Sequence, residues 1–159
     1  WRGPMVISAI KTFTQKVNWK DLDFIIIDMP PGTGDTQLTF SQEIKIDGAI
    51  IVSTPQEVAL LDVKRGIKMF DKLGVKILGL VDNMSFFLGD DKKKYYIFGE
   101  GGVSKTAEEF KKDFLGEIPI NPEVGRQGDL GSPIVESQPD HEISRIYLKF
   151  ANKIKSTYL

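Results

Sequence analysis

The chain has 159 residues, of which 41% are hydrophobic and 27% charged, as expected for one globular domain. Its formal net charge of −1 gives no electrostatic argument for binding to nucleic acid or to a membrane. The absence of cysteine excludes disulfides and thiolate metal ligands within these residues. Without a signal-peptide pattern or a long apolar span we expect a cytoplasmic protein. Because the sequence begins with Trp1, we expect a fragment.

Apolar periodicity predicts strands that alternate with helices, which is typical of a parallel sheet built from βαβ units. A polar loop is expected at 85–94 and an irregular stretch at 121–139. In chain order, the predicted elements are a helix at 5–17, a strand at 24–28, a helix at 36–43, a strand at 48–53, a helix at 55–73 that stops at Gly74, a strand at 75–81, a helix at 104–111, a strand at 114–118 and a helix at 142–158.

The most informative segment runs from Phe24 to Asp35. Its apolar run enters Asp28 without polar alternation, as in a strand buried on both faces. A carboxylate at the end of such a strand lies where open α/β sheets place ligands, although a strand-end Asp also commonly caps a turn. The two prolines that follow stiffen the exit from the sheet, and Gly32 lets backbone approach a ligand closely. This pattern favours a phosphate-sensing loop over a surface turn.

Two further positions lie at the same predicted sheet edge. Asn83 follows the strand at 75–81, and a side-chain amide there can pair with the edge of a base. Pro119 follows the strand at 114–118. Either position is equally compatible with an ordinary turn.

Gly99 to Thr106 reads GEGGVSKT and nearly matches a phosphate-binding loop, with Ser104 in place of the last glycine. No core strand feeds it, so we interpret it as a glycine-rich helix entry capped by Ser104. His141, the single histidine, is expected to cap the last helix at the surface.

Together these stretches resemble the Mrp family of P-loop ATPases, the iron–sulfur cluster carriers related to MinD and ParA. The resemblance rests on several motifs in the family's order: WRGPM at 1–5, DMPPGTGDTQLT at 28–39, VDNMSFF at 81–87, IFGEGG at 97–102, FLGEIPINPEV at 114–124 and GDLGSPIV at 128–135. It implies a mainly parallel P-loop NTPase sheet with helices on both faces, incomplete because the N-terminal strands are missing. Residues 1–159 would then be the C-terminal portion of a single ATPase domain.

The resemblance also implies site residues and ligands. Asp28 would hold Mg²⁺ through water, and Gly32 would belong to the catalytic switch II loop. Asn83, Pro119 and Ile120 would lie on the adenine side of bound ATP. The protein would act as an iron–sulfur carrier, forming a homodimer when intact, with apo iron–sulfur proteins as partners and neither nucleic acid nor a membrane.

Two departures qualify this expectation. The phosphate loop is missing, so the fragment alone should not hydrolyse ATP. The Cys-x-x-Cys pair that many relatives carry after the NMS motif is also missing, so cluster binding by thiolates is in doubt. The alternatives are a MinD- or ParA-like positioning ATPase and a non-catalytic, truncated binding module.

Overall fold

The computed structural model describes residues 3–29 and 35–158, and in this part of the chain seven helices accompany four strands. The strands are β1 (Ala49–Ser53), β2 (Ile77–Leu88), β3 (Lys94–Tyr95) and β4 (Phe114–Ile120). The helices are α1 (Gly3–Gln15), α2 (Asp35–Glu43), α3 (Glu57–Leu73), α4 (Gly102–Glu109), α5 (Pro122–Asp129), α6 (Ile134–Ser137) and α7 (Glu142–Tyr158).

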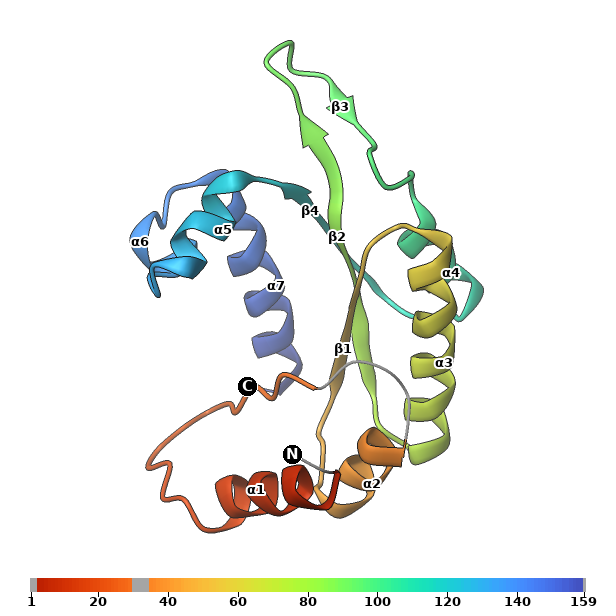
Figure 1. Ribbon diagram of the computed structural model, residues 1–159, viewed down its shortest axis with the longest axis vertical. Helices are drawn as coiled ribbons and strands as arrows, with labels where there is room; N and C mark the ends of the chain where they lie inside the picture. Colours follow the sequence, from red (N-terminus) through yellow and green to blue (C-terminus); the bar gives the residue numbers. More distant parts are fainter. Residues whose placement is uncertain (1–2, 30–34, 159) are drawn as a thin grey trace.

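The sheet is built around β2. β1 and β4 both pair with it in parallel, and the two-residue β3 pairs antiparallel with its far end. Helices α3 and α4 lie on one side of the strands and α7 on the other (Figure 1). This confirms the predicted α/β class, a mainly parallel sheet with helices on both faces.

Two apolar clusters fix the layers. On the first face, Ile67 of α3 and Val103 of α4 pack with Leu80 of β2, and all three are fully buried. On the second face, Phe150 of α7 packs with Val81 and with residues of β4. Central strand β2 thus contributes side chains to both clusters, as expected of a strand covered on both faces.

The predicted strand at 24–28 is wrong. Residues 24–28 have no strand structure, and Ile26 is 84% exposed. Figure 1 draws this stretch as a coil that runs past the C-terminal end of α7, and Phe24 packs edge-on against Tyr158, with ring centroids 6.3 Å apart. An apolar run becomes a buried strand only where neighbouring strands satisfy its backbone groups, and no described strand pairs with this one.

Three other expectations need correction. β2 continues to Leu88 and turns back into β3, so much of the predicted polar loop at 85–94 is a hairpin. Residues 121–139 hold α5 and α6 where an irregular stretch was expected. Ser104 does not cap α4, since its Oγ bonds to the Gly101 carbonyl and Gly101 is the N-cap.

Other boundaries are confirmed. Helix α3 ends at Gly74, whose φ of 70° is the left-handed conformation that glycine adopts without strain. Helix α7 covers the predicted range, and His141 Nδ1 accepts a hydrogen bond from the Ile143 N–H at 3.2 Å, as expected of a cap.

Candidate nucleotide-side site

Asn83 lies where β2 leaves its regular pairing with β4. It is in register with Ile118, and the pairing is irregular from there to Phe87. Met84 follows with a positive φ of 55°, which is uncommon for a residue other than glycine. Ser85 Oγ donates a hydrogen bond to the Ile118 carbonyl at 3.2 Å and so ties the irregular segment to β4. The bulge is therefore fixed to the neighbouring strand.

Pro119 and Ile120 form the end of β4, directly beside this bulge. Pro119 is buried, Ile120 is partly exposed, and Ile120 is in register with Phe87 of β2. The fold thus brings all three residues predicted for the base side onto two adjacent strands. The side-chain amide of Asn83 has no hydrogen-bond partner among residues 3–29 and 35–158, so its donor and acceptor are available to a ligand.

Asp28 lies apart from this group. It is exposed and lines a cavity of about 340 Å³ between α1 and the coil at 24–28, and Asn83, Pro119 and Ile120 do not line it. The cavity wall is mostly apolar and includes Ile10, Phe13 and Trp19. Gly32, the second predicted catalytic residue, lies outside the described residues.

The side chains of Asp28 and Asn83 can be compared with the ligands that the family resemblance implies, Mg²⁺ and a base. Mg²⁺ usually takes one or two carboxylates together with phosphate oxygens, so a single exposed carboxylate at Asp28 suits a nucleotide-bound ion. In the part of the chain that the structure describes, no group of three acidic, histidine or cysteine side chains could hold a metal by itself. The Asn83 side-chain amide, which bonds to no residue that the structure describes, suits the edge of a base.

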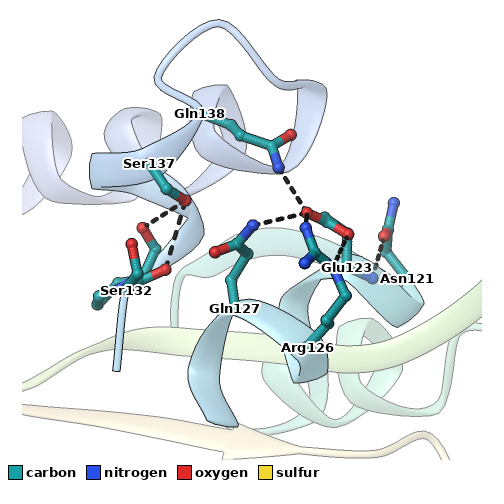
Figure 2. Close-up of polar contacts among 8 residues, drawn as sticks. Asn121, Glu123, Arg126, Gln127, Ser132, Ser137 and Gln138 are labelled. Carbon is teal, nitrogen blue, oxygen red and sulfur yellow. Dashed lines mark hydrogen bonds and ion pairs between the residues drawn. The ribbon is translucent and has the colours of Figure 1, made fainter. Parts of the chain in front are cut away.

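Two polar residues near the site had no predicted role. Asp82, which precedes Asn83, is 1% exposed, and its Oδ1 has no partner among the described residues. Burial, together with the nearby charge of Glu117, raises the pKa of Asp82 to about 6. Glu123 accepts several hydrogen bonds just after Ile120 (Figure 2). The spacing of Glu123 and Arg126 was a local signal for a helix there.

Comparison with known proteins identifies the family. The model of the ParA-type family described as NUBPL iron-transfer P-loop NTPase matches residues 1–155. The chain belongs to this family. An iron–sulfur cluster carrier protein from Aquifex aeolicus is 46% identical over 152 residues, which cover 95% of this chain and 42% of the relative. The resemblance to Mrp-type iron–sulfur carriers is therefore confirmed.

Solved structures agree on the fold. A nucleotide-binding protein from Archaeoglobus fulgidus, in complex with ADP and with cobalt found, is 40% identical, with a TM-score of 0.72. The match covers 80% of this chain and 53% of that protein. The cell-division ATPase MinD from Pyrococcus furiosus has a TM-score of 0.69 at 22% identity, over 98% of this chain and 59% of MinD, which shows the fold alone.

The chain thus spans less than half the length of the Aquifex carrier. No helix within residues 3–29 and 35–158 is both long and apolar enough to cross a membrane.

Proposed function

We propose that this chain is the C-terminal portion of the domain of an ATP-binding, magnesium-dependent ATPase that acts as an iron–sulfur cluster carrier. The cluster is cargo, and because residues 1–159 contain no cysteine, thiolate ligands for it would come from elsewhere. The intact protein would form a homodimer and deliver clusters to apo iron–sulfur proteins. A cytoplasmic location stays a prediction from the sequence.

One observation carries the nucleotide part of this proposal: Asn83, whose amide bonds to no described residue, lies on the strand next to Pro119 and Ile120. Asn83 lies just beyond the part of β2 that pairs with β1, and Pro119 and Ile120 end β4; open α/β sheets bind ligands at the carboxyl ends of their parallel strands. The amide would hydrogen-bond the adenine edge while the segment Pro119–Ile120 flanks the ring. The ADP complex of the 40% identical archaeal protein supports the choice of ligand.

Asp28 and Gly32 are the residues proposed to act on the phosphate side of the nucleotide. The Asp28 carboxylate would hold Mg²⁺ through water, and the Gly32 backbone would sense the γ-phosphate. Hydrolysis also needs a glycine-rich loop with its lysine, which residues 1–159 do not contain. In a longer protein that has this loop, Asp28→Ala should abolish ATPase activity, and unchanged turnover would refute the assignment.

The base site is tested by nucleotide binding. Calorimetric titration of a longer protein that has the glycine-rich loop, with ADP and with GDP, should show a preference for ADP in the wild type. Asn83→Ala should weaken ADP binding about ten-fold through the loss of one or two hydrogen bonds, and Asn83→Asp should lose the preference for adenine. Asn152→Ala, which removes an exposed amide from α7, is the matched control and should bind as the wild type does. Equal ADP affinity in Asn83→Ala would refute the base site.

The rival function is a MinD- or ParA-like positioning ATPase that docks on a membrane through its last helix. Helix α7 does expose basic residues, among them Arg145, Lys149 and Lys155. Its apolar side, however, is packed on β4 through Phe150, Ile146 and Tyr147. A helix whose apolar face is already covered has little left to insert into lipid. Co-sedimentation of the protein with anionic vesicles would favour the rival.

A further inference from the structure

A single carboxylate organises the first turn of α5, just beyond the proposed base site. Asn121 caps this helix, since its Oδ1 accepts a hydrogen bond from the Glu123 N–H at 2.9 Å. Glu123 in turn accepts hydrogen bonds from Arg126 Nε (2.8 Å) and Nη2 (2.5 Å), Gln127 Nε2 (2.8 Å) and Gln138 Nε2 (2.5 Å), as Figure 2 shows. These donors, Arg126 first, lower the pKa of Glu123 to about 2.

The bond from Gln138 differs from the others because it comes from outside α5. Gln138 follows α6, 15 residues beyond Glu123, whereas Arg126 and Gln127 belong to α5 itself. The Gln138 side chain therefore links the start of α5 to a separate part of the chain.

Gln138 is itself anchored to the body of the protein. The Oγ of Ser144, a fully buried residue of α7, lies 2.7 Å from the Gln138 carbonyl oxygen. Helix α7 is fixed to the sheet by Phe150, which packs on β4. A continuous path of contacts thus runs from Glu123 through Gln138 and α7 back to the strand that carries Pro119.

We propose that Glu123, acting through Gln138, is a positioning residue that holds the segment Pro119–Asn121 in place. Upstream, the bond from Ser85 to the Ile118 carbonyl fixes the same segment to β2. The segment is then held at both ends, which reduces its freedom before a ligand arrives. The role of this segment in binding a base rests on the proposed function. The contacts that hold the segment in place do not depend on that function.

Gln138→Ala isolates this link, because it leaves the pairing of Glu123 with Arg126 intact. Amide hydrogen exchange of residues 120–127 in the full chain should become about ten-fold faster, since a bond to a charged group is lost. The control is Glu136→Gln, an exposed carboxylate on α6 that bonds to no side chain within residues 3–29 and 35–158 and whose loss should change nothing. In the double variant E123Q/Q138E, an amide at position 123 again faces a carboxylate at position 138. This variant should therefore recover part of the protection from hydrogen exchange that the single variant Q138E loses.

Binding of ADP separates this proposal from the proposed function. In Gln138→Ala the affinity for ADP should fall several-fold while far-UV circular dichroism stays unchanged. If a longer wild-type protein that has the glycine-rich loop binds no ADP, the nucleotide site fails, and hydrogen exchange still decides the role of Glu123. Unchanged exchange at residues 120–127 in Gln138→Ala would overturn the positioning role, whether or not ADP binds.

Discussion

Asp82 on β2 is in register with Glu117 on β4, so two carboxylates stand side by side on one face of the sheet. Asp82 is buried, whereas Glu117 is partly exposed and lies 3.7 Å from the ammonium of Lys94. Burial, together with the nearby charge of Glu117, disfavours the ionised form of Asp82 and so raises its pKa.

The first prediction concerns pH. The pKa of Asp82 is raised from 3.8 to about 6, so the folded state binds this proton more tightly than the unfolded state does. The resulting stabilisation is complete below about pH 4 and is lost as the pH rises through 6. Asp82→Asn should remove about 1–2 kcal/mol of this pH dependence between pH 4.5 and 7.5, measured by urea unfolding. Asp129→Asn, at an exposed position, should keep the wild-type profile, and matching profiles for wild type and Asp82→Asn would contradict the prediction.

The second prediction compares two glycines in helices. A Cβ at Gly102 would lie 2.6 Å from the Pro55 carbonyl oxygen and 2.8 Å from Leu60 Cδ1, so Gly102→Ala must displace backbone. It should lower the free energy of unfolding by about 1–3 kcal/mol. A Cβ at Gly125 would meet nothing within 4 Å, so Gly125→Ala should instead stabilise α5 by about 0.5–1 kcal/mol. Thermal unfolding of both variants gives the test, and equal shifts in Tm would contradict the clash at Gly102.

Sequence patterns that act over a few residues predicted the helices that such short-range interactions define. The apolar periodicity of α7 and the glycine stop after α3 were readable because capping and amphipathic spacing act within a few residues. Helix α5 was missed because its two glycines suggested an irregular stretch. Its Asn cap, first-turn proline and Glu–Arg spacing were nevertheless present in the sequence.

Pairing between distant segments set the limits of prediction. The strand-end rule expected Asn83 just after a strand, whereas β2 runs past it to Leu88; Pro119 and Ile120 do lie at the end of the neighbouring β4. The same rule failed at residues 24–28, because a strand also needs partners. The bond between Glu123 and Gln138 joins residues on separate elements, and no spacing rule reveals such a contact.

The third prediction concerns the core under α3. Ile67 is fully buried against β2 and α4, so Ile67→Ala should cost about 2–5 kcal/mol and Ile67→Val about 0.5–1.5 kcal/mol. Ile97→Ala, at a residue that is 61% exposed, should stay within about 0.5 kcal/mol of the wild type. Denaturant unfolding measures all three variants. A loss below about 1 kcal/mol in Ile67→Ala would show that the cluster repacks around the cavity.

The last prediction concerns the free edge of β1. This strand pairs with β2 on one side, no described strand pairs with its other side, and Val52 is 58% exposed. Unpaired edges and exposed apolar side chains promote association, so residues 1–159 alone should self-associate as concentration rises. Val52→Lys puts a charge on this strand and should shift sedimentation velocity profiles toward the monomer. Val58→Lys, at an exposed position of α3, introduces the same charge away from the edge and should leave the profiles unchanged. Because the two variants carry equal net charge, a monomer shift of the same size in both would assign association to charge rather than to the edge of β1.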